Sequence, residues 1–354
     1  MRAMILKEFH ELRRDRRTVA MLVVMPVAML VIFGYAANFK VDHLSTAIVG
    51  PYAKIAEAQL PQLLEGGLAD SGLVEAGLVN PDLFDVVRVD PHGDAKNLVR
   101  DNVADVVIDT STNPPTVYLD GSALFVAMAA SAELGRMGDK VNVEVLYNPD
   151  LKTAWVMVPA LIGLVLAFVG TIVTSIGLVR ERAAGTLEQL AVMPLRPIDV
   201  IIGKIAPYFV LAALDMVIIT VLGVVIFKVP FNGNVGVFAL GALLFLFVVL
   251  GLGVLISTVS QTQAQAIQGA IMVTVPQVLL SGFIFPLTSM AVGIRWIGYC
   301  LPLTYFVQIS QGVMLRGAPM SSLWLPFTVL AGMAVFIVAV SVLRFRRTLA
   351  GGGS

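Results

Sequence analysis

Cysteine, histidine and charged residues are scarce in this chain of 354 residues, and each shortage excludes a class of protein. The single cysteine, Cys300, rules out an intrachain disulfide and a cysteine-rich metal site. The three histidines lie far apart and lack the spacing of a zinc motif. Charged residues make up 14% of the sequence, whereas an average soluble domain has about 25%. That is too few to cover the surface of a soluble enzyme of this length.

A net charge of either sign is also missing, because 24 basic residues balance 24 acidic ones. This balance argues against a protein that binds nucleic acid. The composition is instead dominated by hydrophobic residues, at 57%.

The hydrophobic residues are concentrated in long runs, and a helix needs about 20 mostly apolar residues to cross a bilayer. Six runs satisfy this requirement: residues 19–37, 154–179, 205–227, 235–259, 266–285 and 323–343. We therefore predict an α-helical polytopic membrane protein with six transmembrane helices, the first occupying residues 19–38. The half-hydrophobic segment 286–322, broken by glycine and proline, is predicted to form re-entrant helices before the last span.

Basic residues near the span ends predict the orientation in the membrane. Thirteen of them flank the spans on one side, where both termini and the loop 180–204 would lie, and three lie in the short loops of the other side. We therefore expect both termini to be cytoplasmic. Residues 351–354, GGGS, are excluded as a remnant of cloning.

Residues 39–153 would then form a domain outside the membrane, carrying 17 acidic and 8 basic residues. Strand-like stretches alternate with helical ones in this segment, which predicts a small α/β domain with a mixed sheet. The predicted strands are 46–49, 84–89, 103–108, 116–119 and 141–146, and the predicted helices are 53–64, 93–101 and 122–137.

Two segments on the cytoplasmic side have the character of contact elements. Residues 1–18 have apolar positions on one helical face among many bases, which predicts an amphipathic helix along the inner leaflet. This helix serves either as an anchor alone or also as a contact for a cytoplasmic partner. In the loop 180–204, RERAAGTLEQLAVMPLRPIDVIIGK, Thr186 is a good N-cap with Gln189 at the capping-box position. A compact, capped elbow of this kind is typical of a docking element.

The sequence of this loop resembles the cytoplasmic loop of permeases in the ABC type-2 transporter family, the membrane subunits of ABC exporters. Further stretches that resemble the family are LYNPDLKTAWVMVPAL at 146–161, LSGFIFPLTSM at 280–290, LPLTYF at 301–306 and QGVMLRG at 311–317. The large domain between spans 1 and 2 is similar to the layout of one branch of this family. The resemblance covers residues 1–350.

The resemblance implies that the loop couples this chain to an ABC ATPase subunit. The residues it assigns to this contact are Glu181, Arg182, Gly185, Thr186, Leu187, Glu188 and Gln189. The chain lacks a P-loop motif, so we expect no catalytic residue and no directly bound cofactor, with ATP and Mg²⁺ held by the partner. The scarcity of cysteine and histidine already argues against a metal site. The implied assembly has two ATPase subunits and a second permease, identical or homologous, in the inner membrane of a prokaryotic cell.

One acid, Asp215, lies in a predicted span, and an acid there is a functional candidate by default. In a functional role, Asp215 would face the translocation path together with Gln277. In a structural role, its carboxyl group would be protonated or would form a hydrogen bond with Thr220 or Gln277. We favour the structural role. The glutamines of the turn before span 5 (Gln261, Gln263, Gln265 and Gln268) are expected to cap helix ends.

These features predict the permease subunit of an ABC exporter that moves a drug, lipid or other small amphipathic substrate out of the cytoplasm or inner leaflet. The alternative is a membrane-anchored receptor or sensor with an external ligand-binding domain. It would require a cytoplasmic signalling domain, and the cytoplasmic segments are too short to supply one.

Overall fold

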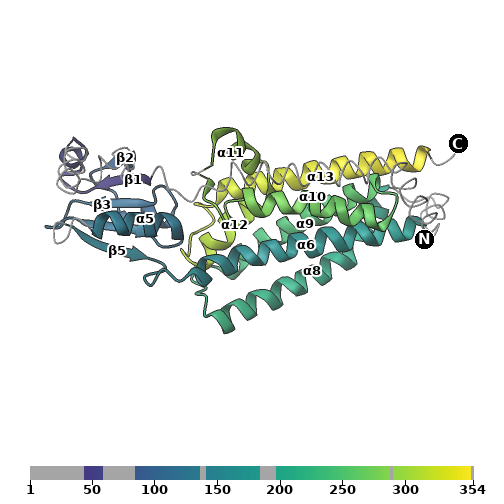
Figure 1. Ribbon diagram of the computed structural model, residues 1–354, viewed down its shortest axis with the longest axis horizontal. Helices are drawn as coiled ribbons and strands as arrows, with labels where there is room; N and C mark the ends of the chain where they lie inside the picture. The colour runs from purple at the N-terminus through teal and green to yellow at the C-terminus, as the bar shows by residue number, and fades with distance from the viewer. Residues whose placement is uncertain (1–43, 59–83, 136–140, 184–196, 288–289, 352–354) are drawn as a thin grey trace, which may run out of the picture.

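The computed structural model describes the chain except residues 1–43, 59–83, 136–140, 184–196, 288–289 and 352–354 (Figure 1). An α/β domain lies at one end of its long axis, and a helical bundle extends from it. The strands are β1 (Leu44–Val49), β2 (Phe84–Asp90), β3 (Val106–Asp109), β4 (Thr116–Asp120) and β5 (Asn142–Leu146). The helices are α4 (Ala95–Arg100), α5 (Leu124–Gly135), α6 (Thr153–Ala183), α8 (Pro197–Phe227), α9 (Val235–Val259), α10 (Gln263–Leu280), α11 (Val292–Tyr299), α12 (Pro302–Met314) and α13 (Trp324–Gly351).

The five strands form one mixed sheet in the order β2-β1-β3-β4-β5. The β3–β4 pair is antiparallel, while β1 pairs in parallel with β2 and β3, and β4 with β5. Each predicted strand is found within three residues of its expected start. The mixed sheet expected from the sequence is confirmed.

Side chains alternate between the two faces of this sheet, as the two-residue period of a strand requires. Val106 packs with α5 on one face, and its neighbour Val107 packs with α4 on the other. The sheet is therefore covered on both sides, which explains why its central strands are apolar at successive positions. Asp94 caps α4 by accepting a hydrogen bond from the backbone N–H of Lys96 at 3.0 Å.

Four helices in the described part of the chain are long and apolar enough to cross a membrane. They are residues Thr153–Arg180, Ala206–Phe227, Val235–Val259 and Trp324–Ser341. These correspond to predicted spans 2, 3, 4 and 6. The predicted span 1 lies outside the described residues.

The predicted fifth span corresponds to α10, which is shifted toward the N-terminus and does not meet the same criterion. Its four glutamines lower its hydropathy, and it ends at Leu280 because Ser281 is its C-cap and Gly282 has φ +84°. Glycine adopts this conformation without the steric cost of a side chain. The segment predicted to be re-entrant holds two short helices, α11 and α12, and their passage into a membrane stays a prediction.

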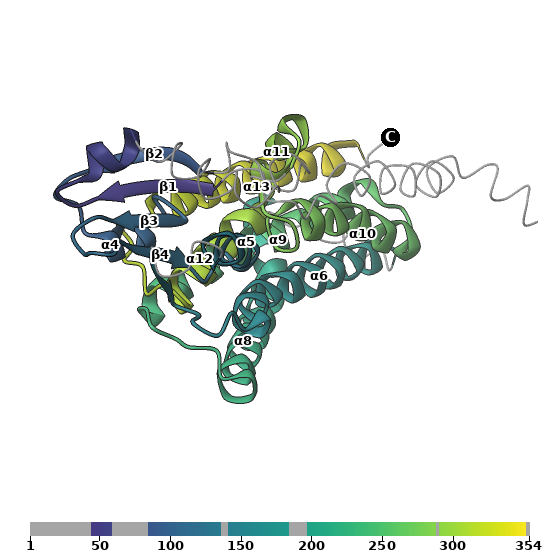
Figure 2. The same ribbon diagram turned by 60° about the vertical axis from the view of Figure 1, so that its left-hand side comes forward.

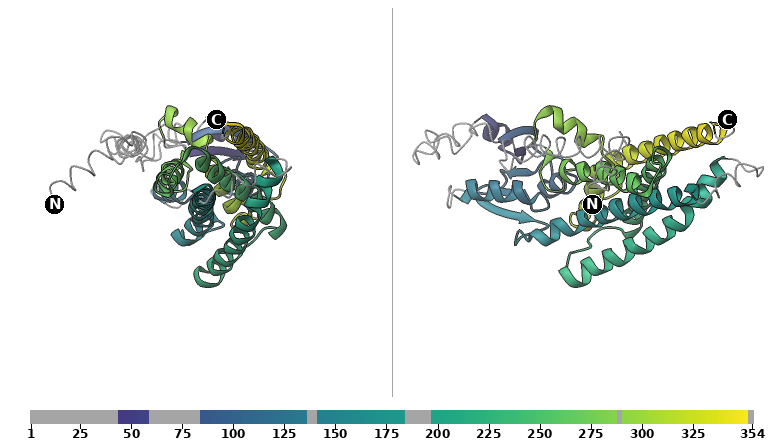
Figure 3. Two further views of the ribbon diagram at one scale, coloured as in Figure 1. Left: turned by 90° about the vertical axis from the view of Figure 1, so that its right-hand side faces the viewer. Right: turned by 45° about the vertical axis from the view of Figure 1, so that its right-hand side comes forward.

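The bundle has two distinct ends (Figures 1, 2 and 3). Beside the α/β domain lie the start of α6, the end of α8, and helices α11 and α12. At the far end, α6 finishes, α9 turns into α10, and α13 finishes. The predicted coupling loop connects α6 to α8, so it starts and ends on the side away from the sheet.

Helices α6 and α9 are the centre of the bundle, because α6 packs on α8, α9, α10 and α12. Their core includes Phe245, Phe306 and Ile162, all fully buried. The rings of Phe245 and Phe306 stack with their centroids 4.6 Å apart. By contrast, α8 lies at the edge (Figure 2) and leaves a long apolar surface exposed, including Val210, Leu214, Val217 and Val221.

Candidate functional site

The predicted coupling residues lie at the end of α6 and beyond it. Glu181 and Arg182 belong to the last turn of this helix, but their side chains lie outside the described part. Gly185, Thr186, Leu187, Glu188 and Gln189 also lie outside the described residues. Their role in docking stays a prediction.

The described residues next to this loop connect α6 to α10. The guanidinium Nε of Arg180 donates a hydrogen bond to Oε1 of Gln263 at 3.3 Å. In the α9–α10 turn, Thr262 caps α10 by accepting from the N–H of Gln265, and the Gln265 side chain accepts in return from the N–H of Gln261 at 2.9 Å. This arrangement resembles a capping box, except that the Gln265 side chain accepts from the residue before the N-cap. Gln265 therefore caps the start of α10, as expected, whereas Gln263 accepts from Arg180. The chain entering the coupling loop is therefore attached to a well-capped neighbouring helix.

Asp215 lies half-buried in the middle of α8, among exposed apolar residues. The Thr220 hydroxyl donates its proton to the Met216 carbonyl at 2.7 Å, so it does not donate to Asp215. Gln277 belongs to α10, and its amide donates to the Val273 carbonyl at 3.2 Å. The structure does not bring Asp215 and Gln277 into one hydrogen-bonded pair within the described residues.

Gln277 is instead part of a buried polar set on α6 and α10. Six side-chain oxygens on these two packed helices are buried without a hydrogen-bond partner among the described residues: those of Thr171, Thr174, Gln268, Thr274, Gln277 and Ser281. A buried polar atom without a partner costs free energy, and such atoms are uncommon in native structures. In helices that cross a membrane, polar side chains facing the interior mark contacts between helices or a pathway for substrate.

A second constellation joins the bundle to the α/β domain. Arg316, just after α12, inserts its guanidinium into the domain and pairs with Asp120 at 3.2 Å. Its Nη1 also donates to Asn102 Oδ1 at 2.6 Å and lies 3.4 Å from Ser122 Oγ. Both side chains of the ion pair are almost fully buried, with 7% and 0% of their surface exposed. Gly317 then turns the chain with φ +62°, a conformation that favours glycine.

A second connection between the two parts, within the described residues, is the turn from β5 into α6. Asn148 is fully buried there, and its amide donates to the carbonyls of Gly121 and Lys152, at 3.3 and 3.2 Å. Its carbonyl oxygen accepts from the N–H of Lys152 at 2.9 Å. A third contact is the 2.8 Å hydrogen bond from the Ser322 hydroxyl to Asp101. The α/β domain is thus fixed to the bundle at both the start of α6 and the approach to α13.

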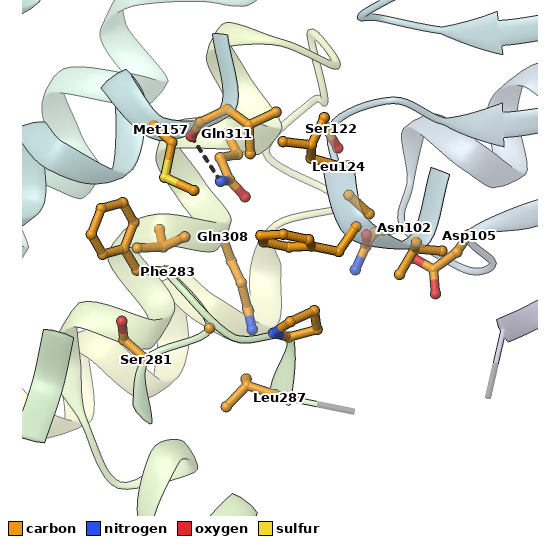
Figure 4. A pocket seen from close by; sticks show the side chains of 17 residues that line it. Asn102, Asp105, Ser122, Leu124, Met157, Ser281, Phe283, Leu287, Gln308 and Gln311 are labelled. Atoms are coloured by element: carbon orange, nitrogen blue, oxygen red, sulfur yellow. Dashed lines mark hydrogen bonds between the residues drawn. The ribbon is translucent and has the colours of Figure 1, made fainter. Parts of the chain in front are cut away.

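A cavity of about 190 Å³ lies at this junction (Figure 4). One side is formed by the domain, with Asn102 and Asp105, and the opposite side by Met157 and Phe283. Gln311 closes one wall, its amide Nε2 donating to the Val156 carbonyl at 3.2 Å. The remaining lining residues are Ser122, Ala123, Leu124, Phe125, Val126, Ser281, Gly282, Pro286, Leu287, Val307 and Gln308.

The sequence places Arg316 in a short outer loop and in a stretch that resembles the family, but neither pattern predicts its role. A stronger signal was present, because Arg316 is the only charged residue between Arg295 and Arg344. An isolated charge in a long apolar stretch requires a partner. That partner, Asp120, lies in a distant part of the chain, and the sequence does not indicate which of the domain's 17 acids it is.

Comparison with known proteins agrees with this architecture. A family described as "ABC-2 family transporter protein" matches residues 16–343. Over 343 residues the chain is 28% identical to "Probable multidrug ABC transporter permease YbhR" of Escherichia coli, covering 91% of each chain. It is 27% identical to "Probable multidrug ABC transporter permease YbhS" of the same species, covering 98% of this chain and 97% of that protein.

A third relative is the "Inner membrane transport permease YhhJ" of Escherichia coli, 32% identical over 57% of this chain and 54% of that protein. The family expected from the loop and its neighbouring motifs is therefore confirmed, and the receptor alternative gains no support. Because the family match spans nearly the whole chain, this protein belongs to the ABC-2 family of transporter permeases.

Proposed function

We propose that this chain is the membrane-spanning permease subunit of an ABC exporter, which moves a drug, lipid or other amphipathic substrate from the cytoplasm or inner leaflet outward. The family match over residues 16–343 carries this proposal. The apolar helices α6, α8, α9 and α13 support a membrane location. The relatives named as multidrug permeases support the substrate class.

The power source of this transporter is a separate ABC ATPase that binds ATP and Mg²⁺. It docks on the loop 180–204 through Glu181, Arg182, Gly185, Thr186, Leu187, Glu188 and Gln189, with the N-terminal segment 1–18 as a second contact. The position of this loop supports the assignment, since α6 and α8 enter it at the end of the bundle away from the α/β domain. The hydrogen bond between Arg180 and Gln263 connects the loop to α10, so a movement of the ATPase is transmitted to two helices at once.

The assembly contains two ATPase subunits and a second permease, identical or homologous, related by a two-fold axis. Both termini are cytoplasmic, and the acidic α/β domain is on the outer side of the inner membrane. The translocation path passes the buried polar oxygens of α6 and α10, including Gln277. This assignment is supported by their lack of partners among the described residues.

Inside-out membrane vesicles test both the direction and the coupling. Vesicles containing the chain and its partner ABC ATPase should accumulate a fluorescent amphipathic dye when ATP is added, as an exporter requires. Glu188→Ala should reduce ATP-dependent accumulation and co-purification of the ATPase together, whereas Glu144→Gln, on the exposed face of β5, should change neither. ATP-driven dye release from the vesicles, instead of uptake, would contradict the outward direction.

A further inference from the structure

The junction cavity has the composition of a ligand site, because apolar walls surround a few polar groups that converge on it. Phe125 of α5 and Phe283, after α10, supply aromatic walls, and Met157 of α6 supplies a polarisable one. Each wall comes from a different element, so the cavity exists only while the α/β domain and the bundle are joined. Small-molecule sites favour this arrangement at the boundary between domains.

Among the described residues that line the cavity, the charged one is Asp105. This residue precedes β3, and its described side-chain partner is the hydroxyl of Ser45, which donates to Oδ2. Burial raises the pKa of the Asp105 carboxyl, and the nearby Asp120 raises it further, while Ser45 and Arg316 act in the opposite direction. The carboxylate is thus held in a place where its own charge is unfavourable.

The nearest guanidinium does not pair with this carboxylate. Nη1 of Arg316 is directed to Asp120, Asn102 and Ser122 instead. On the bundle side of the cavity, the Ser281 hydroxyl is 1% exposed and has no hydrogen-bond partner among the described residues. A cation between apolar walls would compensate the carboxylate, and a polar group on the same ligand would satisfy the hydroxyl.

We propose that this junction cavity binds an aromatic monocation, with its ammonium group beside Asp105 and its ring between Phe125, Phe283 and Met157. An aromatic ring fits these walls, and ammonium groups interact favourably with aromatic faces as well as with carboxylates. This inference deepens the proposed function by naming a ligand class for its outer side. Binding itself requires neither ATP nor a direction of transport.

The test uses two ligands that differ in charge, benzyltrimethylammonium and benzylsulfonate. Binding of each to the purified full chain in lipid nanodiscs is measured by saturation-transfer NMR, with empty nanodiscs as the background. The cation should bind with a dissociation constant on the order of 1 mM or tighter, as suits so small a ligand, and the anion should not bind. Asp105→Asn should lower the affinity for the cation about tenfold, the loss typical of a partly buried charge contact.

Asp109→Asn is the matched control, since Asp109 is an acid at the other end of β3 that does not line the cavity. It should leave cation binding unchanged. Phe283→Ala should lower the affinity for the cation while Asp105 is intact. This variant tests the contribution of the aromatic wall independently of the charge. Equal binding of both ligands, or equal binding by wild type and Asp105→Asn, would overturn the proposal. Because no ATPase is present, either result stands apart from the outcome of the transport assay.

Discussion

Arg316 and Asp120 form a buried ion pair at 3.2 Å across 196 residues of sequence, and this pair fixes the α/β domain to the helical bundle. The guanidinium also donates a hydrogen bond to Asn102. The bundle side therefore contributes the side chain of Arg316, and the α/β domain contributes its partners Asp120 and Asn102. Replacement of both partners of a buried ion pair by apolar residues can leave the stability unchanged. Removal of one partner lowers the stability, because it leaves an uncompensated buried charge.

We expect Arg316→Met to lower the free energy of unfolding by about 3–5 kcal/mol, because the buried Asp120 carboxylate loses its counter-charge. Thermal unfolding in detergent measures this change. Arg88→Met is the control, since the Arg88–Asp90 pair is exposed and should contribute about 0–1 kcal/mol. A double variant Arg316→Met/Asp120→Asn should recover part of the loss, and a double variant no better than Arg316→Met would argue against the pair.

Asp105 provides a prediction on pH. Its pKa is raised in the folded protein above its ordinary value of 3.8, mainly by burial, so the native state binds more protons than the unfolded state in the pH range just above 3.8. Stability therefore falls as the pH rises through that range. We expect Asp105→Asn to increase the melting temperature at pH 7.5 and to change it less at pH 4, as measured by scanning calorimetry. The same increase at both pH values would exclude this titration as the cause.

Gly163 tests the contact between α6 and α12. A Cβ atom at this position would lie within 2.4 Å of the Phe306 ring, which is fully buried and stacked on Phe245. Since a buried, stacked ring would have to shift to make room, Gly163→Ala should cost about 1–3 kcal/mol by overpacking. Gly332→Ala, in α13, is the counterpart, because nothing lies within 4 Å of its added methyl group. It should be neutral or stabilise the helix by up to about 1 kcal/mol.

Trp296 of α11 and Trp324, the first residue of α13, are 68% and 62% exposed. Helix α11 and the start of α13 lie at the end of the bundle beside the α/β domain (Figure 1). Exposed tryptophan is enriched where a bilayer meets water, so both rings should contact lipid near the headgroups. Single-tryptophan variants in liposomes with brominated lipids measure this contact. Shallow bromine labels should quench Trp296 and Trp324 more than deep labels do, and quenching of Trp296 mainly by deep labels would instead favour a re-entrant α11.

The sequence was informative where a pattern depends on neighbouring residues. The strands of the α/β domain and the helix α9 were predicted closely, since two-residue alternation and long apolar runs are local signals. The end of α10 was predicted five residues late, because Phe285 and its neighbours are apolar although Gly282 has already turned the chain. Hydropathy alone does not report such a turn.

The contacts between the α/β domain and the bundle could not be predicted from local sequence patterns. Arg316, Asn102 and Asp120 come together only after the domain folds back onto the bundle, and a single sequence does not specify which distant residues meet. The cavity has the same origin, because its walls belong to α5, α6, α12, the segment between α4 and β3, and the segment after α10. The family resemblance includes the segments around Asn148 and Arg316, but it does not explain what these two residues do in the structure. Their hydrogen bonds at the junction now supply that reason.

The large separation of Arg316 from Asp120 also has a meaning during synthesis of the chain. A ribosome adds about 5–20 residues per second, so Asp120 is made roughly 10–40 seconds before the guanidinium that neutralises it. The α/β domain reaches its final attachment only after α12 and the residue that follows its last turn, Arg316, have been made. A chain that is truncated before Arg316 would therefore lack the counter-charge of Asp120, a chemical difference between unfinished and complete protein.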